Sequence, residues 1–162
     1  MAALKSSFAP VVDADTRLLI LGSLPGEVSL QRGQYYANPR NQFWRLMATV
    51  TDSQMPDAYE DRLAHLLRHG IGLWDTVKAA HRTGSLDAAI QSAQPNALLD
   101  LIAGLPRLAA IGFNGGTAAR MGQAQLAGTP GLALVALPSS SPAFTLPFEA
   151  KAAVWLGLRS YI

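Results

Sequence analysis

Four short apolar runs constrain the fold of this 162-residue chain more than any other feature. Each run is apolar on both faces instead of alternating with polar residues, and each is followed by Gly, Pro, Ser, Asn or Asp. Continuous apolar runs of this length are typical of strands in a parallel sheet that is covered on both sides. We therefore predict strands at Arg17–Leu21, Ile71–Trp74, Leu108–Gly112 and Leu132–Leu137.

Helical patterns separate these runs. The segment Pro56–His69, for example, starts with Pro-Asp and ends before Gly70, which is a good pair of start and stop signals. Strands that alternate with helices predict an α/β fold of three layers, α/β/α, around a central, mostly parallel four-stranded sheet. We expect a single domain over residues 1–162, with its first dozen residues loosely ordered. The predicted helices are Asn41–Thr51, Pro56–His69, Pro95–Ala103, Gly115–Gln123 and Pro147–Tyr161.

The composition excludes several classes of site. The chain has no cysteine, which rules out disulfides, thiolate metal sites, iron–sulfur clusters and a cysteine nucleophile. His65 and His69 are spaced to share a helix face, but no carboxylate motif accompanies them, so we expect neither a metal nor a cofactor. The N-terminus lacks an apolar signal segment, and no apolar run is long enough to span a bilayer. These features favour a cytoplasmic protein with no membrane partner, and we also expect a monomer.

The distribution of charge is more informative than the net charge of +2. The stretch Val28–Val50 contains Arg32, Arg40 and Arg45 and no acidic residue. Such an asymmetry permits a basic face that binds nucleic acid. Scattered charges that only solvate the surface explain the same pattern equally well.

Polar and glycine-rich residues follow all four predicted strands. In open parallel sheets, ligands bind at the carboxyl ends of the strands. A purely structural sheet also needs turns at these ends, so the convergence indicates a site without identifying its ligand. The four segments are Gly22–Gly26, Asp75–Thr76, Phe113–Gly115 and Pro138–Pro142.

Aromatic side chains are concentrated in the segment Gly22–Trp44. Tyr35, Tyr36 and Phe43 are candidates to stack on a nucleobase, an interaction that contributes on the order of 1–3 kcal/mol per base. Trp44 opens an apolar helix and is expected in the core, and Phe43 could serve either purpose.

Polar residues near the strand ends could supply the chemistry. Asn38 and Asn41 could contact a base edge or an attacking water, or could instead cap the helix that follows. Asp75 and Glu27 are carboxylates that could orient water and stabilise a cationic sugar. Arg40 suits a phosphate contact. The loop Pro138–Pro142 could bind phosphates through its serines, or could be a plain turn; it has no GxSxG elbow of a serine hydrolase.

Three motifs, taken in order, resemble the uracil-DNA glycosylase superfamily: GSLPG, NPRNQFW and LPSSSPA. NPRNQFW is similar to the HPxNxFW of mismatch-specific uracil/thymine glycosylases. The hypoxanthine-DNA glycosylase branch, with GS-x-P-G, PRN-x-FW and LPS-[ST]-SPA, is the most similar. The resemblance runs from Arg17 to about Phe148 and includes LWDT at Leu73–Thr76 and the GFNG turn.

The resemblance implies a monofunctional DNA N-glycosylase. Such an enzyme flips a deaminated base, hypoxanthine or uracil, out of double-stranded DNA and hydrolyses its N-glycosidic bond to leave an abasic site. It implies that Asn41, with Asn38 in reserve and Glu27 nearby, is catalytic. It places Phe43 and Asp75 against the base, and the loop that contains Ser139, Ser140, Ser141 and Pro142 against the DNA. From the residues themselves we also predict Gly22, Ser23, Leu24 and Tyr36 around the base and Arg40, Asn114 and Pro138 against the DNA.

Two departures from the superfamily pattern affect the expected chemistry. Leu24 stands where most members have a catalytic Asp or Asn, and Leu137 stands where many have the His or Asn that stabilises a uracil anion. The hypoxanthine branch shares both departures. The alternatives are a G:U or G:T mismatch glycosylase and a non-catalytic DNA- or nucleotide-binding module, which Leu24 keeps open. A small-molecule hydrolase lacks a recognisable nucleophile–base pair.

Overall fold

A four-stranded parallel sheet forms the centre of the protein. The computed structural model describes residues 3–162. The strands lie in the order β3 (Ile71–Asp75), β2 (Leu18–Gly22), β6 (Ala110–Asn114) and β7 (Ala133–Leu137). All neighbouring strands of this sheet are parallel, which confirms the predicted central sheet. Their registers place Gly22 beside Asp75 and Asn114 beside Leu137, so all four strands end at one edge.

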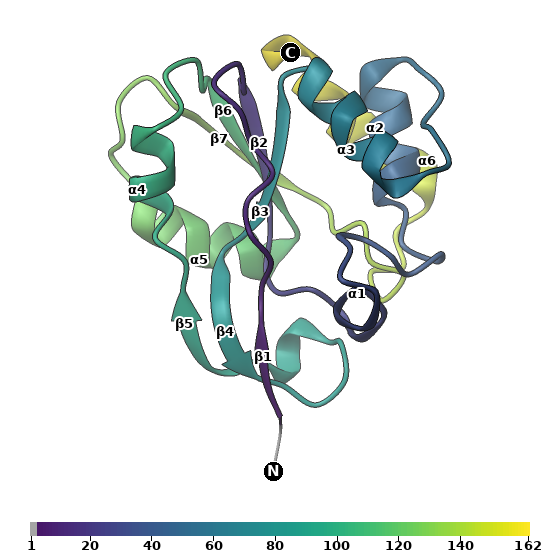
Figure 1. Ribbon diagram of the computed structural model, residues 1–162, viewed down its shortest axis with the longest axis vertical. Helices are drawn as coiled ribbons and strands as arrows, with labels where there is room; N and C mark the ends of the chain where they lie inside the picture. The colour runs from purple at the N-terminus through teal and green to yellow at the C-terminus, as the bar shows by residue number, and fades with distance from the viewer. Residues whose placement is uncertain (1–2) are drawn as a thin grey trace.

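Helices cover both faces of this sheet, as Figure 1 shows. On one side lie α4 (Leu98–Ala103) and α5 (Gly116–Leu126). On the other lie α2 (Phe43–Thr51), α3 (Tyr59–Arg68) and α6 (Phe148–Trp155), which the 3₁₀ helix η2 (Leu156–Tyr161) continues. The three predicted layers are therefore present. No helix formed by residues 3–162 is long and apolar enough to cross a membrane.

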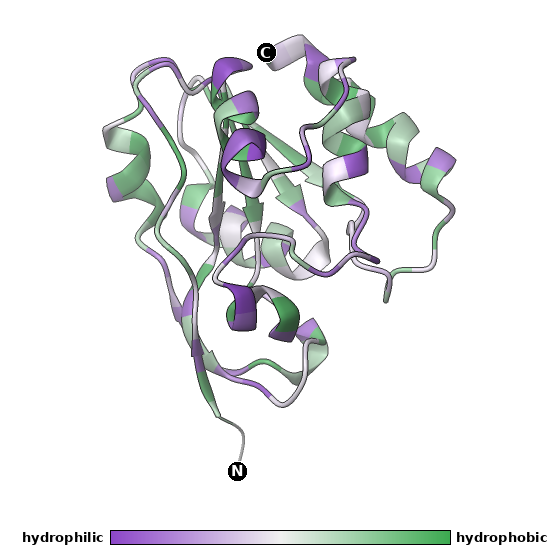
Figure 2. Cartoon of the chain, turned by 45° about the vertical axis from the view of Figure 1, so that its right-hand side comes forward, coloured by the Kyte–Doolittle hydropathy of each residue, from purple (hydrophilic) through white to green (hydrophobic). Residues whose placement is uncertain are grey.

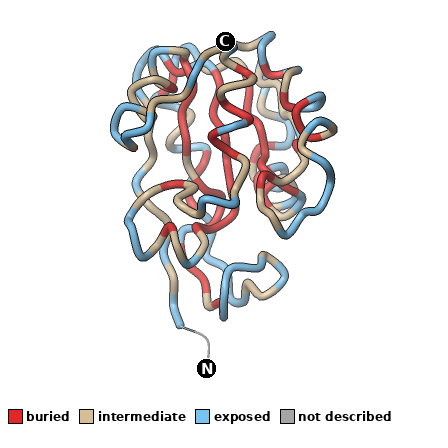
Figure 3. The backbone as a smooth tube through the Cα atoms, turned by 90° about the vertical axis from the view of Figure 1, so that its right-hand side faces the viewer, coloured by how far each residue is buried: buried red, intermediate tan, exposed pale blue. Residues whose placement is uncertain are grey.

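The core is divided by the sheet into two clusters. Side chains alternate along β2, so that Leu18 and Ile20 pack with α2 and α6, whereas Leu19 and Leu21 pack on the α4 and α5 side. All five residues of β2 are buried, and the strands form the buried centre of Figure 3. In Figure 2 hydrophobic residues dominate the same strands, while the helices carry hydrophobic and hydrophilic residues together. Burial of each large aliphatic side chain stabilises the fold by about 1.5–3 kcal/mol.

A second, antiparallel sheet was not predicted. It has the order β1 (Leu4–Ser6), β4 (Val77–His81) and β5 (Gln91–Pro95). The expectation that the first dozen residues are loosely ordered is wrong for residues 3–12, because β1 pairs with β4 and Val11 pairs with Leu73. Residues 1 and 2 lie outside the described part. Every residue of β5 is exposed, so this edge strand carries no apolar signal in the sequence.

Two further elements position the site. Helix α1 (Glu27–Arg32) begins after Gly26 and ends at Gly33, whose φ of 64° requires a left-handed conformation that glycine adopts without strain. The short 3₁₀ helix η1 (Asp87–Ala89) lies in the connection between β4 and β5. We call residues 82–90 the η1 loop. Neither element has a pattern that predicted it from the sequence.

Candidate active site

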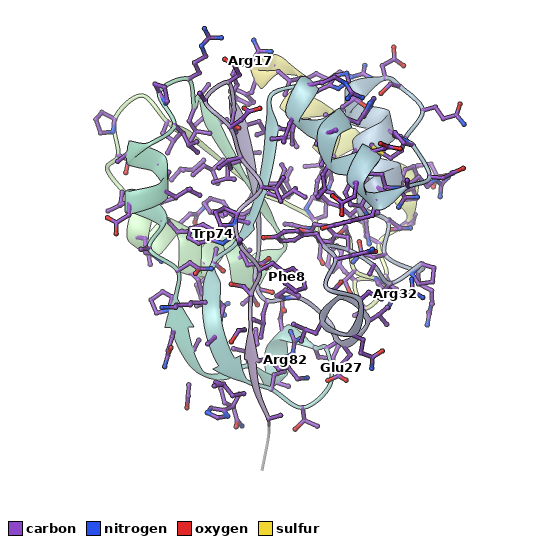
Figure 4. The ribbon with its side chains drawn as sticks, viewed as in Figure 1. Phe8, Arg17, Glu27, Arg32, Trp74 and Arg82 are labelled. Carbon is purple, nitrogen blue, oxygen red and sulfur yellow. The ribbon has the colours of Figure 1, made fainter. Side chains whose placement is uncertain are left out.

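A cavity of about 400 Å³ opens at the carboxyl ends of the parallel strands. It is walled by the segment after β2, by the end of β3, by the η1 loop and by the loop after β7. Figure 4 shows Glu27 and Arg82 near α1 at this end of the molecule, far from Arg17 at the opposite end. The predicted site residues that line the cavity are Gly22, Ser23, Leu24, Glu27, Tyr36, Asn38, Asn41, Asp75, Asn114, Ser139, Ser140, Ser141 and Pro142.

Three predicted residues do not line this cavity: Arg40, Phe43 and Pro138. Arg40 is exposed on the surface, where a phosphate can reach it. The carbonyl oxygen of Pro138 accepts a hydrogen bond from Trp155 Nε1 at 2.9 Å, which fixes the start of its loop on α6. Phe43 is fully buried, so the structure does not bring its ring to the cavity.

Tyr36 occupies the place predicted for Phe43. The two rings are stacked, with centroids 3.8 Å apart and an interplanar angle of 14°, and Tyr36 is the one that lines the cavity. Its φ of 53° is uncommon for a residue other than glycine, and the Trp44 Nε1 donor on its carbonyl oxygen helps to hold it. Burial raises the pKa of the Tyr36 hydroxyl, which stays protonated at physiological pH. Phe43 can contact a base only if Tyr36 moves.

Asp75 ends β3 at the floor of the cavity, beside Gly22. Its side chain is buried, and its Oδ2 has no hydrogen-bond partner among residues 3–162. Burial and the negative charge of Asp87 raise the pKa of Asp75 to about 7, against the opposing effect of Arg82. A neutral carboxyl group presents an O–H donor and a C=O acceptor side by side. Asp75 can therefore read a base edge that offers one acceptor and one donor.

Gly22 leaves the space that Asp75 and Tyr36 occupy. A Cβ atom at position 22 would lie 2.7 Å from Asp75 Oδ1 and 3.1 Å from the Tyr36 hydroxyl oxygen. We expect Gly22→Ala to lower a single-turnover reaction rate about a hundredfold, because displacing catalytic groups by about 1 Å costs that much. Gly116→Ala is the matched control, since a Cβ there meets no atom within 4 Å. Equal rates for both variants and the wild type would contradict the crowded geometry.

Asn38 and Asn41 each use their side-chain oxygen locally. Asn38 Oδ1 accepts the backbone N–H of Arg40 at 3.0 Å, and Asn41 Oδ1 accepts that of Phe43 at 2.9 Å. Asn41 thus accepts the N–H of the first residue of α2 from the position before the N-cap, Gln42, whose own side chain forms no cap hydrogen bond. Both residues still line the cavity, and their amide nitrogens form no hydrogen bond with residues 3–162. The local hydrogen bonds of the two side-chain oxygens are therefore compatible with a role of Asn38 and Asn41 in the site.

Asn114 and Ser140 hold the loop after β7 in place. Asn114 Oδ1 accepts the Ser140 backbone N–H, and Asn114 Nδ2 donates to Ser140 Oγ, both at 2.9 Å. The same Nδ2 donates to the Tyr36 hydroxyl at 3.3 Å. Both side chains are buried and hydrogen-bonded to each other. They therefore position Tyr36 and the neighbouring serines. Ser139, Ser141 and Pro142 remain partly accessible at the cavity.

Comparisons with known proteins identify the family. The model of the uracil DNA glycosylase superfamily matches residues 9–159. The chain belongs to this superfamily. Two relatives named hypoxanthine DNA glycosylase, from Methanosarcina barkeri and Methanosarcina acetivorans, are each 43% identical over 112 and 113 residues. These alignments cover 68% and 69% of this chain and 71% and 72% of the relatives.

The solved structures agree with this assignment. The solution NMR structure of a Methanosarcina acetivorans protein, provisionally described as a uracil DNA glycosylase, matches with a TM-score of 0.88 and 38% identity. The match covers 98% of this chain and 99% of that chain. The predicted family and its fold are thus confirmed, and the protein is a DNA N-glycosylase by family.

The two leucines that depart from the superfamily pattern are core residues of this glycosylase. Leu24 is 7% exposed and packs in a small cluster with Val77 and Ala80. Leu137 is 4% exposed and belongs to the larger cluster on the α2 and α6 side. Neither carries a polar atom on its side chain, so catalysis must use other groups of the cavity.

The η1 loop is the part of the glycosylase site that sequence reasoning missed. Ser85, Leu86 and Asp87 line the cavity. Asp87 Oδ1 accepts a hydrogen bond from Ser23 Oγ at 2.6 Å, and Ser85 Oγ accepts the backbone N–H of Glu27 at 2.9 Å. A carboxylate two residues after a Gly-Ser turn was the available signal, but nothing in the sequence showed that this turn folds back onto Ser23. Phe144, which also lines the cavity, was missed in the same way.

Proposed function

We propose that this protein removes hypoxanthine from double-stranded DNA by hydrolysis and leaves an abasic site. The observation that carries the proposal is Asp75, a buried carboxyl group with an unpartnered oxygen at the floor of the cavity. In its neutral form its O–H donates to the O6 of hypoxanthine, and its C=O accepts the N1–H. The relatives named hypoxanthine DNA glycosylase support the same substrate.

Tyr36 supplies the stacking surface for the extruded base. Its ring is backed by Phe43, and its hydroxyl is held by Asn114, so it offers a rigid aromatic face at the cavity. Stacking on this face offsets part of the few kcal/mol that removing a nucleotide from the duplex costs. The cost is lowest at damaged or mismatched pairs, which favours inosine over the bases of intact pairs. Arg40 and the accessible serines grip the backbone phosphates on either side.

The chemistry is hydrolysis without strand cleavage. No lysine is present among the described residues that line the cavity, so no amine is placed to form a Schiff base with the sugar. The enzyme acts as a cytoplasmic monomer in this proposal.

Uracil is the second candidate substrate, because its N3–H and O4 present the same donor and acceptor as the N1–H and O6 of hypoxanthine. Asp75 in its neutral form fits either edge. Opposite guanine, uracil lies in a mismatch that also opens easily. The superfamily assignment is consistent with this activity.

A panel of duplexes tests the function. The duplexes contain inosine, xanthine, uracil opposite guanine, or thymine opposite guanine, and an undamaged duplex is the control. Abasic sites are detected by alkaline cleavage. We expect inosine to be excised fastest, uracil more slowly and the undamaged duplex not at all, with no strand break before alkali. Faster excision of uracil than of inosine would support the mismatch-glycosylase alternative. Binding of the inosine duplex without any excision would support the non-catalytic alternative.

A further inference from the structure

The cavity contains three carboxyl groups, and the η1 loop supplies one that the sequence motifs do not. The three are Glu27, Asp75 and Asp87. Hydrolysis of an N-glycosidic bond is accelerated by a group that accepts a proton from the attacking water and stabilises the positive charge on the sugar. An asparagine amide cannot accept that proton, so Asn41 and Asn38 are not candidates for this group. Among the described residues that line the cavity, the three carboxyl groups are the candidates.

Glu27 and Asp75 are poorly suited to this task. The exposed carboxylate of Glu27 pairs with the Lys5 ammonium, which lowers the pKa of Glu27 and makes it a weaker base. Asp75 holds its proton up to about neutral pH because burial raises its pKa to about 7. It is therefore a hydrogen-bond donor to the base and not an acceptor for water.

Asp87 has one fixed and one free carboxylate oxygen at the cavity. One of its oxygens, Oδ1, is fixed by the Ser23 hydroxyl at 2.6 Å. The side chain makes no other hydrogen bond with residues 3–162, so Oδ2 is free to accept one from water. Asp87 is half-buried and lines the cavity, and its negative charge is close enough to raise the pKa of Asp75. The two carboxyl groups therefore face the same space.

The η1 loop is held rigidly against the segment after β2. The fully buried guanidinium of Arg82 donates to the carbonyl oxygens of Leu24, Pro25 and Gly84. Lys5 Nζ donates to the same Gly84 oxygen at 2.7 Å. The positive charge of Arg82 also attracts Asp87. A carboxylate held by such contacts is positioned before substrate binds, which is what efficient catalysis requires.

We propose that Asp87 is the catalytic base that takes a proton from the attacking water. As the water oxygen forms its bond to C1′, the C1′–N9 bond breaks, and its electron pair leaves with the purine. Asp75 donates a hydrogen bond to the purine O6, where negative charge develops. The departing purine takes up a proton at nitrogen from solvent. Asp87 later releases to solvent the proton that it took from water, so the protons balance. Asp87 thus supplies the carboxylate that Leu24 cannot.

This proposal rests on the proposed glycosylase activity, and its test separates the two. Excision of inosine is measured in single turnover at pH 5 and at pH 6. Removing the charge at position 87 lowers the pKa of Asp75, so a rate loss of the same size at both pH values shows that ionisation of Asp75 is not its cause. Binding is measured by anisotropy with a duplex containing 2′-fluoro-2′-deoxyinosine, whose glycosidic bond resists cleavage. We expect Asp87→Asn and Asp87→Ser to lower the rate by about 10²–10⁴-fold, with binding changed less than threefold. Ser23→Ala removes the hydrogen bond that fixes Asp87 Oδ1, and we expect it to lower the rate by roughly ten- to a hundredfold.

Asp100→Asn is the matched control, the same aspartate-to-asparagine change at an exposed position of α4 outside the cavity, and its rate should stay within about twofold of the wild type. If the wild type excises no base, the proposed activity fails. If it excises inosine and Asp87→Asn does so within threefold of the same rate, the role of Asp87 is overturned. A loss of rate matched by an equal loss of binding would also overturn it, because Asp87 would then only help to hold DNA.

Discussion

Asn41→Ala should lower single-turnover excision of inosine by about 10²–10³-fold while DNA binding is retained. This is the usual loss when one preorganised hydrogen-bond donor is removed from an active site. The Oδ1 of Asn41 is occupied by the backbone N–H of Phe43, so Nδ2 is the atom left to act in the cavity. We expect Nδ2 to donate to the oxygen of the attacking water while Asp87 accepts one of its protons. The water would thus be held from both sides.

A second substitution separates this role from the structural one. Asn41→Ala also removes the hydrogen bond to the Phe43 N–H at the start of α2, which costs about 1 kcal/mol of folding stability. Asn41→Asp keeps an oxygen for this hydrogen bond but has no amide donor, so its melting temperature should stay near that of the wild type while excision remains slow. Asp13→Ala removes a local hydrogen bond of the same kind, to the backbone N–H of Asp15 and outside the cavity, and serves as the control. Excision by Asn41→Asp at the wild-type rate would reject the donor role.

The central sheet could be predicted because its strands are buried on both faces. Their apolar runs are continuous, and the residues that follow each run mark where the chain turns. The helices of both outer layers likewise show their apolar faces in the sequence. The second sheet lacked any such signal, since β5 is exposed and polar and is held by hydrogen bonds to β4. Backbone pairing of this kind leaves no pattern in side-chain hydropathy.

The site was predicted where it lies at strand ends and missed where it depends on long-range contacts. Gly22, Asp75 and Asn114 end their strands, so the rule for parallel sheets brings them together. Asp87 is held at the cavity by long-range contacts, among them the hydrogen bonds from Arg82 to the carbonyl oxygens of Leu24 and Pro25. Tyr36 lines the cavity in a left-handed backbone conformation, and the Phe43 ring is stacked against it away from the cavity. Sequence spacing alone does not specify that conformation.

The rate of excision should fall tenfold for each pH unit above about 7 in the wild type and should not fall in Asp75→Asn. The neutral form of Asp75 is the one that donates to the base, and its pKa is raised to about 7, so the active fraction declines once the pH passes that value. Asparagine presents a permanent donor and acceptor with nearly the same shape, and it does not titrate. Single-turnover rates measured from pH 5 to 9 test this. A wild-type rate that rises through pH 7 would mean that the ionised form is the active one.

The pH dependence of folding stability independently tests whether the pKa of Asp75 is raised. Between the ordinary pKa of an aspartate, about 4, and the raised value of about 7, the folded protein keeps a proton that the unfolded chain has released. The free energy of unfolding should therefore decrease as the pH rises across this window and then level off. Asp75→Asn lacks this contribution, so its advantage over the wild type in urea unfolding should grow from pH 4 to pH 7. A constant difference between the two proteins would show that Asp75 ionises normally, and the pH dependence of excision would then need another group.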